Sequence, residues 1–345
     1  MNRSGSDDSS KAPDGAKLRR NLITLVVLIL VVVGLVTTLP GLHGVARRLS
    51  HVTPGWIALA VGVEVLSGIG YVIAFQQVFA RVPRRTGTRV AWSEMAFQTV
   101  VPTGGAGGLA LGGWMLHEHG ARWGWIAERS AVLFLLTSAI SVFALTLFGF
   151  LLAVGVLAGP HHLLLGAVPA AVGAVVLLFA LASPRLMTSA VRRHKWKHPR
   201  LKTALEGLAE SVRDTEQLLL SGDWRIVGAV GYLAFDIVVL WIGFLAFGHA
   251  PGVAPLVLGY LIGSMANSIP IPGGVGALDG GLIGALVLYG VNATSATAAV
   301  LFYHAVGLFV PLLIGTVAFL LERPHLAEPL PDVPARAARK NRNAR

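Results

Sequence analysis

A proline- and glycine-rich loop occurs twice in this chain, each time within apolar sequence. The copies cover residues 101–108 (VPTGGAGG) and 269–276 (IPIPGGVG), and a shift of 168 residues places Pro102 on Pro270. Both residue types break helices. A broken helix inside a membrane is tolerated only where it is buried in protein or faces a watery cavity. Two breaks at corresponding positions of two halves indicate a transport site, although two ordinary interhelical loops would leave the same pattern.

Composition restricts the class of protein. The 345 residues are 54% hydrophobic and only 13% charged, which is typical of a polytopic membrane protein. There are no cysteines, which excludes disulfides and thiolate chemistry. The formal net charge is +11, but the basic residues lie in loops. Membrane topology and anionic lipid headgroups explain them, so no nucleic-acid partner is expected.

The apolar runs predict an all-α integral membrane protein with six full spans. Two repeat halves, about 56–157 and 225–321, each consist of a span, a Pro/Gly-rich re-entrant hairpin and a second span, with inverted topology. The stretch 255–290 is either such a hairpin or two thin full spans. The predicted spans lie at about 21–39, 56–80, 125–157, 162–182, 225–248 and 295–321, and the hairpins at about 91–113 and 255–290.

Basic residues set the expected orientation. With both termini in the cytoplasm, 26 of the 28 Lys and Arg residues lie on the inner side of the cytoplasmic membrane. Residues 1–20 are predicted to be a disordered tail, 21–322 the transmembrane domain and 323–345 a disordered basic tail. Apolar residues at helical spacing over about 200–220 predict an amphipathic cytoplasmic helix between the two halves.

Ionisable groups inside spans are costly and are therefore functional candidates. Glu64 and Asp236 lie within predicted spans, and each has a paired structural role as its alternative. Glu94, before the first loop, is expected to be solvated. Asp279 follows the second loop and either caps a half-helix or titrates during transport.

The backbone N–H groups of the two glycine turns form a natural cradle for an anionic headgroup. No metal site, cofactor or hydrolase motif is recognised, and the chain is not expected to be an enzyme. The expected headgroup path comprises Pro102, Gly104, Gly105, Gly107, Gly108, Glu128, Arg129, Asn267, Pro270, Pro272, Gly273, Gly274, Gly276, Asp279, Tyr303 and His304.

The chain resembles the lysylphosphatidylglycerol synthase transmembrane-region family, which includes the flippase part of the multiple peptide resistance factor. The resemblance covers about residues 20–322. It is strongest in 268–279 (SIPIPGGVGALD), continues in 300–304 (VLFYH), and is weaker at 98–108 and at Glu128-Arg129. Asp279 stands where the family usually has Glu, and His304 where it has Arg. The soluble aminoacyl-transferase domain is absent, so lysyl transfer is not expected.

This resemblance implies movement of an anionic lipid or lipid-linked intermediate between membrane leaflets. Two alternatives stay open, namely an integral-membrane transferase and a non-catalytic accessory protein in envelope lipid or glycolipid assembly. The expected partners are membrane lipids, with a homo-oligomer or a separately encoded enzyme as further candidates.

Overall fold

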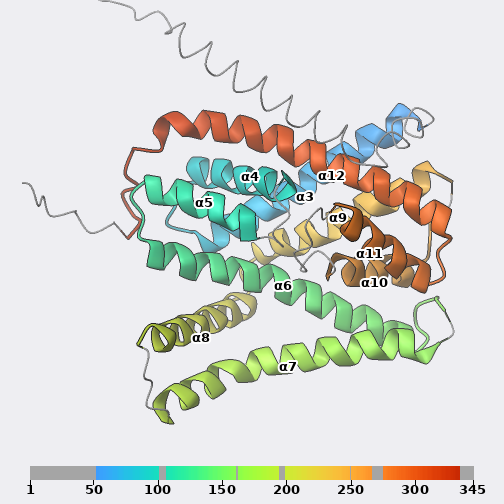
Figure 1. Ribbon diagram of the computed structural model, residues 1–345, viewed down its shortest axis with the longest axis horizontal. Coiled ribbons are helices and arrows are strands. Elements are labelled where there is room, and N and C mark those ends of the chain that lie inside the picture. Colours follow the sequence, from blue (N-terminus) through green and yellow to red (C-terminus); the bar gives the residue numbers. More distant parts are fainter. Residues whose placement is uncertain are drawn as a thin grey trace, which may run out of the picture. The chain divides into compact units, whose positions relative to one another are not determined.

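The computed structural model describes residues 52–100, 106–160, 162–193, 199–248, 250–265 and 275–334, and the regular structure among these residues is helical (Figure 1). For residues 106, 184–193, 199–205 and 275–279 it describes the backbone alone. The predicted tail 1–20 and the predicted span 21–39 lie outside the described residues. So do residues 101–105 and 266–274, which hold most of the two glycine loops.

Five of the described helices are long and apolar enough to cross a membrane. They comprise α3 (Pro54–Val78), α6 (Trp123–Ala153), the part Leu163–Ser183 of α7 (Leu163–Arg193), α9 (Ile226–Ala246), and α12 (Ala293–Glu322) with its short extension to His325. Each coincides with a predicted span. The chain is therefore a polytopic helical membrane protein.

Two pairs of shorter helices flank the glycine loops. In the first half, α4 (Arg84–Val100) and α5 (Ala106–Glu118) enclose residues 101–105. In the second half, α10 (Val253–Met265) and α11 (Val275–Leu288) enclose residues 266–274. The members of each pair pack against each other. Between the halves, α7 is followed by α8 (Pro199–Leu220), which packs on α6 and α7 and covers the segment predicted to be amphipathic.

The two halves repeat both their helix order and their contacts. Each half runs long helix, short helix, glycine loop, short helix, long helix. Helix α4 packs on α12, the last helix of the other half, and the corresponding α10 packs on α6. The first helices of the halves, α3 and α9, pack on each other. This reciprocal pattern is expected of two halves related by a pseudo-two-fold axis.

The same helix ending occurs at equivalent points of the two halves. Gly120 (φ +91°) lies two residues after the end of α5, and Gly290 (φ +84°) lies two residues after the end of α11. After each glycine a backbone N–H reaches back to the last turn, from Ala121 to the Leu116 carbonyl (3.0 Å) and from Val291 to the Leu286 carbonyl (3.1 Å). These bonds form a Schellman motif, for which glycine is favoured because the conformation is left-handed.

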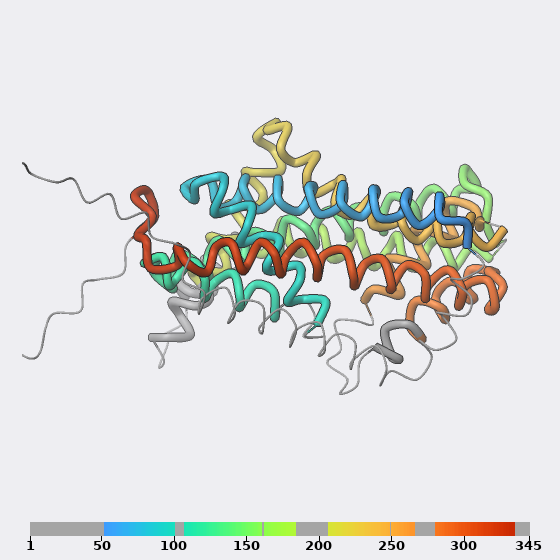
Figure 2. The backbone as a smooth tube through the Cα atoms, turned by 90° about the horizontal axis from the view of Figure 1, so that it is seen from above, coloured from blue at the N-terminus to red at the C-terminus, as the bar shows by residue number. Residues whose placement is uncertain are grey.

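Helices α3 and α9 approach each other closely because glycines face each other at their crossing. A Cβ atom on Gly70 would lie 2.6 Å from the Gly228 carbonyl oxygen, and one on Gly228 would lie 2.8 Å from that of Gly70. Ser67 adds a hydrogen bond of 2.9 Å to the Tyr232 carbonyl. Small residues at such crossings allow backbone contact between helices in membranes. Figure 2 shows α3 running alongside α12, with which it is also in contact.

A buried charge cluster fastens α4, α12 and the segment after α12. Arg89 donates to Glu322 at 2.8 Å, and His119 Nε2 lies 3.1 Å from the same carboxylate. His119 Nδ1 also contacts the Glu328 carbonyl at 2.9 Å, and the Arg122 N–H donates to Pro334. The prediction of a disordered tail from residue 323 is therefore wrong for residues 323–334, which hydrogen bond to the 119–122 turn. Residues 335–345 lie outside the described part.

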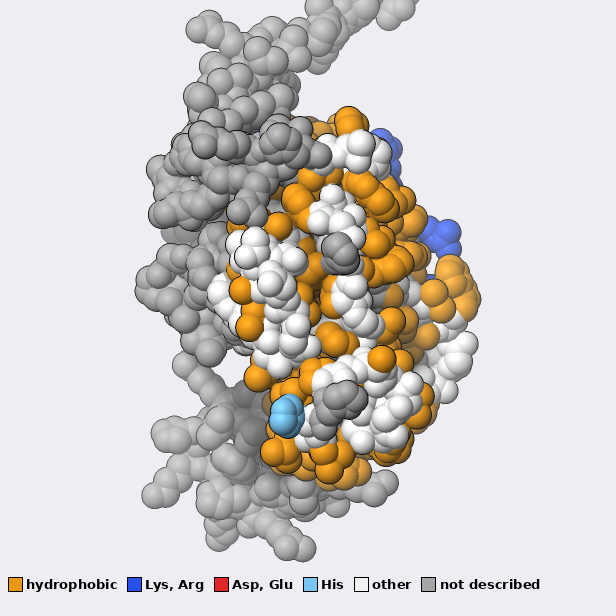
Figure 3. Space-filling view, turned by 90° about the vertical axis from the view of Figure 1, so that its right-hand side faces the viewer, with side chains coloured by type: hydrophobic (Ala, Val, Ile, Leu, Met, Phe, Trp, Pro, Cys, Tyr) orange, Lys and Arg blue, Asp and Glu red, His pale blue; other side chains and the backbone are white. Residues whose placement is uncertain are grey.

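The described loops fall into two groups that differ in charge. One end of the bundle carries the connections after α6, α9 and α11, and the face that it presents is largely apolar and uncharged (Figures 1 and 3). The connections at the other end, between α3 and α4 and between α5 and α6, contain Arg81 and Arg122. This is the asymmetry on which the positive-inside rule operates.

We predict that Gly70→Ala destabilises the protein by about 1–3 kcal/mol, because the added Cβ must push the α3 and α9 backbones apart. Gly62→Ala is the matched control, since it lies on the same helix and its Cβ would meet nothing within 4 Å. Thermal unfolding of the detergent-solubilised variants measures the difference. Equal melting temperatures for the two variants would contradict the close crossing.

Candidate functional site

A polar cavity of about 360 Å³ lies where the flanks of both glycine loops meet. Gln98 precedes the first loop and Leu109 follows it, while Ser264 and Met265 directly precede the second, and all four residues line the cavity. Helices α3, α6 and α9 complete its wall. Its polar lining residues are Tyr71, Gln98, Thr137, Ser138, Ser141, Tyr232 and Ser264. Residues that flank the two repeated motifs, far apart in the sequence, thus line the same cavity.

Three of the hydroxyl groups that line this cavity hydrogen bond to carbonyl groups of their own helices. Thr137 donates to the Leu133 carbonyl (3.1 Å), Ser141 to the Thr137 carbonyl (3.2 Å) and Ser264 to the Leu261 carbonyl (3.0 Å). Such bonds let a helix carry hydroxyls in an apolar environment, and the hydroxyl can rotate toward a ligand. The described lining contains no charged side chain. The cavity therefore provides neutral hydrogen-bonding groups.

Glu94 of α4 lies beside this cavity. It was predicted to be solvated, and this prediction is wrong because the side chain is buried. It is only 1% exposed, and its carboxylate accepts a 2.8 Å hydrogen bond from the Tyr71 hydroxyl. Helix α5 reaches it because glycines face α4. A Cβ on Gly112 would overlap the Glu94 carboxylate, and one on Gly108 would lie 2.8 Å from the Glu94 carbonyl oxygen. Gly108, predicted to admit a headgroup, thus makes room for α4 next to the cavity wall.

A second group of polar side chains surrounds Asp236 of α9. The Tyr303 hydroxyl donates to Asp236 at 2.9 Å, and the Tyr260 hydroxyl donates to the same oxygen. Glu64 of α3 and His304 of α12 lie close enough to Asp236 to interact with it electrostatically. Sequence analysis treated these residues separately, and the structure brings four of them together, namely Glu64, Asp236, Tyr303 and His304.

Glu128 and Arg129 are occupied by a different contact. Arg129 donates to Glu128 at 2.6 Å and to Asp214 of α8 at 2.8 Å, and the three side chains are 26–30% exposed. Arg129 thereby fastens the amphipathic helix α8 to the first turns of α6. The predicted headgroup role of this pair has no support in these contacts.

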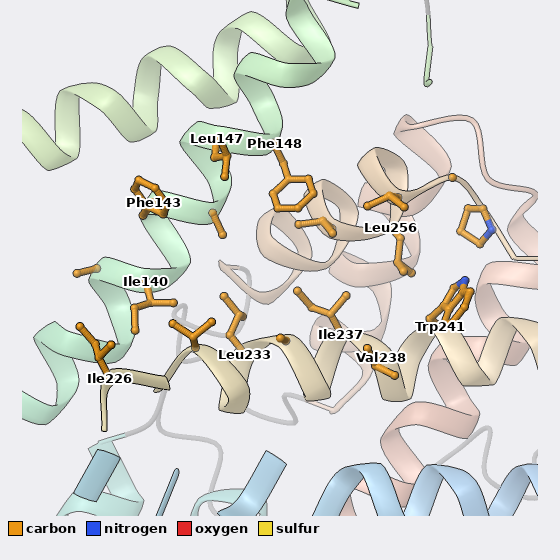
Figure 4. A pocket seen from close by; sticks show the side chains of 18 of the residues that line it. Ile140, Phe143, Leu147, Phe148, Ile226, Leu233, Ile237, Val238, Trp241 and Leu256 are labelled. Carbon is orange, nitrogen blue, oxygen red and sulfur yellow. The ribbon is translucent and has the colours of Figure 1, made fainter. Parts of the chain in front are cut away.

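An apolar groove of about 950 Å³ lies between α6, α9 and α10 (Figure 4). Phe143 and Leu147 of α6 face Leu233 and Ile237 of α9 across it, and Leu256 belongs to α10. The same three helices also line the polar cavity, through other residues such as Ser141, Tyr232 and Ser264. The polar cavity and the apolar groove thus lie on neighbouring faces of the same three helices.

Several predicted site residues cannot be placed. Pro102, Gly104, Gly105, Asn267, Pro270, Pro272, Gly273 and Gly274 lie outside the described residues, and Gly276 and Asp279 are described only as backbone of α11. Gly107 is buried in α5. Within the described part of the chain, no group of three or more His, Cys, Asp or Glu side chains could hold a metal ion.

Sequence analysis named only Tyr303 among the tyrosines of the site and missed the other three. The chain has five tyrosines, and four of them surround the carboxylates, namely Tyr71, Tyr232, Tyr260 and Tyr303. The rings of Tyr71 and Tyr232 are 5.3 Å apart, which connects the Glu94 side of the site to the Asp236 side. The signal was present, because a rare phenol within a span needs a hydrogen-bond partner when buried.

We predict that the Tyr71–Glu94 hydrogen bond contributes about 0.5–3 kcal/mol of coupling energy, because it satisfies a buried carboxylate. The test is a double-mutant cycle of Tyr71→Phe and Glu94→Met, followed by unfolding in a denaturing detergent. Tyr71→Phe should cost clearly less in the Glu94→Met background than in the wild-type protein. Additive costs would show that the hydrogen bond contributes nothing.

Comparison with known proteins places the chain in a family. The model of the lysylphosphatidylglycerol synthase transmembrane region matches residues 22–315. A UPF0104 membrane protein of Methanothermobacter thermautotrophicus is 33% identical over 91 residues, which is 26% of this chain and 26% of that protein. The aligned part thus spans about a quarter of that relative's length. No solved structure matches the chain significantly. The chain belongs to the family of the lysylphosphatidylglycerol synthase transmembrane region.

Proposed function

We propose that this protein moves an anionic lipid or lipid-linked intermediate between the leaflets of the cytoplasmic membrane. The observation that carries the proposal is the polar cavity at the meeting point of the two glycine-loop flanks, next to the apolar groove on the same helices. A lipid needs both environments, since its headgroup must stay hydrogen bonded while its acyl chains stay in an apolar medium.

The cavity would receive the headgroup, and the groove would receive an acyl chain. Because the described cavity lining has no basic side chain, an anionic headgroup would be held by hydroxyls, by the Gln98 amide and by backbone N–H groups of the glycine loops. Such donors bind phosphate without forming a permanent ion pair, which favours release on the other side. The helix pairs α4–α5 and α10–α11 would act as re-entrant hairpins that enter from opposite sides.

The repeat supports alternating access. In transporters built from inverted repeats, the substrate site lies between the halves, and the two halves exchange conformations around it. Here the cavity is lined by α3, α4, α5 and α6 of the first half and by α9 and α10 of the second. Helix α4 of the first half packs on α12 of the second, and α10 of the second half packs on α6 of the first. Each half thus makes the same kind of contact with the other, so the two halves could exchange their conformations.

Lipid movement can be tested with the purified protein in vesicles that contain fluorescent phosphatidylglycerol, phosphatidylcholine or lysylphosphatidylglycerol. An impermeant reductant that bleaches only the outer leaflet then reports the rate of exchange. We expect exchange of phosphatidylglycerol above the rate in protein-free vesicles. If no lipid moves, the protein is not a flippase by itself, and the accessory role becomes the better reading.

We predict that Ser141→Leu slows this exchange about tenfold or more, because overpacking of the cavity wall costs about 1–3 kcal/mol. Ala180→Leu is the control, since it adds a leucine at an exposed position of α7 that lines neither cavity. Both variants must insert and purify like the wild-type protein. Equal rates for the two variants would remove the cavity from the transport path.

The proposed orientation has both termini in the cytoplasm. We predict that a cysteine at Ser221, in the connection between α8 and α9, resists an impermeant thiol reagent in intact cells. A cysteine at His162, between α6 and α7, should react. Both residues are exposed, and the chain has no cysteine of its own. The reverse labelling pattern would invert the topology.

A further inference from the structure

Glu64 and Asp236 lie on the first long helices of the two halves, α3 and α9. Each lies ten residues after the first residue of its helix, counted from Pro54 of α3 and from Ile226 of α9. These two helices cross closely at Gly70 and Gly228. The two acids therefore lie on the helices through which the halves pack on each other, close enough to interact electrostatically.

The surroundings of the pair do not neutralise two negative charges. Glu64 is only 4% exposed, and among the described residues its Oε2 accepts no hydrogen bond. Within the same part of the chain, neither carboxylate forms an ion pair with a lysine or arginine. The ionisable groups that face the pair are Tyr232 of α9, Tyr260 of α10, and Tyr303 and His304 of α12.

The carboxylates of Asp236 and Glu64 differ in their hydrogen bonding. Asp236 accepts hydrogen bonds from the hydroxyls of Tyr260 and Tyr303. Glu64 has a buried oxygen, Oε2, that accepts no hydrogen bond from the described residues, and a proton bound on this carboxyl group would remove a buried charge that has no basic partner there. A single bound proton would therefore satisfy the site.

From this geometry we propose that Glu64 and Asp236 form a proton-binding site in which the pair holds one exchangeable proton. The proton reaches the pair from the polar cavity, because Tyr232 lines that cavity and also faces both acids. Binding forms an O–H bond on one carboxyl group, and release returns the proton to the cavity. In the proposed lipid transporter, on which this further step rests, the bound proton is the coupling ion.

Infrared spectroscopy of the full-length protein in phosphatidylcholine vesicles tests the site without any transport. A protonated carboxyl group has its own carbonyl band, which shifts in D₂O when the proton exchanges. We expect such a band near neutral pH and its loss at high pH. Glu94 is a second buried carboxyl group, so Glu94→Gln is the reference background, and it should keep a titrating band. The double variant Glu64→Gln/Asp236→Asn made in that background should lose the band.

A third variant guards against loss of folding. Tyr303→Phe keeps both carboxylates but removes one hydroxyl from Asp236, so the band should persist to higher pH. The proposal is overturned if the wild-type protein has no exchangeable band, or if the band survives unchanged in the double variant. Displacement of the band by Na⁺ at constant pH would overturn it in favour of a metal-cation site.

The exchange assay in the same vesicles separates this proposal from the proposed function. A titrating band in a protein that moves no lipid would refute lipid transport and leave the proton site standing. Where lipid does move, an imposed pH gradient should accelerate exchange in the wild-type protein and not in the double variant. A gradient without effect on the wild-type protein would overturn the coupling role.

Discussion

The close crossing of α3 and α9 is the contact on which the described architecture depends. In a bilayer, lipid tails solvate apolar side chains as well as a neighbouring helix does, so helices associate through fit and through polar contacts. Gly70 and Gly228 provide the fit, and Ser67 provides a hydrogen bond. Because each half contributes its first helix to this crossing, the halves become fixed to each other there.

The glycine loops interrupt the helices of both halves, and the short helices that result shape the interior of the bundle. Helices α4 and α10 stop at the loops instead of crossing the whole bundle, and Gln98 and Ser264, in their last turns, then line a cavity. Longer neighbours such as α6 supply its remaining wall. The cavity is polar because α6 carries Thr137, Ser138 and Ser141 at this level, with Thr137 and Ser141 bonded back to their own helix. A break in two helices thus produces a polar space inside an apolar bundle.

The spans and the repeat could be predicted from the sequence because hydrophobic length and repeated Pro/Gly motifs are local signals. The partners of single side chains could not. Glu94 looks solvated beside a loop, and only the approach of α5 through Gly108 and Gly112 buries it. Arg129 looks like a headgroup ligand, and its partner Asp214 is 85 residues away. The segment 323–334 looks like a polar tail until His119 and Glu322 are seen to hold it. Such pairings depend on tertiary contacts that no local pattern encodes.

The polar groups beside the cavity form two clusters, one around Glu94 and one around Asp236, and a pair of aromatic rings joins them. Tyr71 bonds Glu94 on one side, and Tyr232 faces Asp236 and Glu64 on the other, while both phenols line the same cavity. Helices α3 and α9 carry these tyrosines as well as the two acids of the repeat interface. Any rotation of one half against the other must therefore change the contact between the two rings, together with the spacing of Glu64 and Asp236. A headgroup in the cavity and the charge on the acid pair would then depend on the same helix crossing, which is the physical requirement for linkage between two sites.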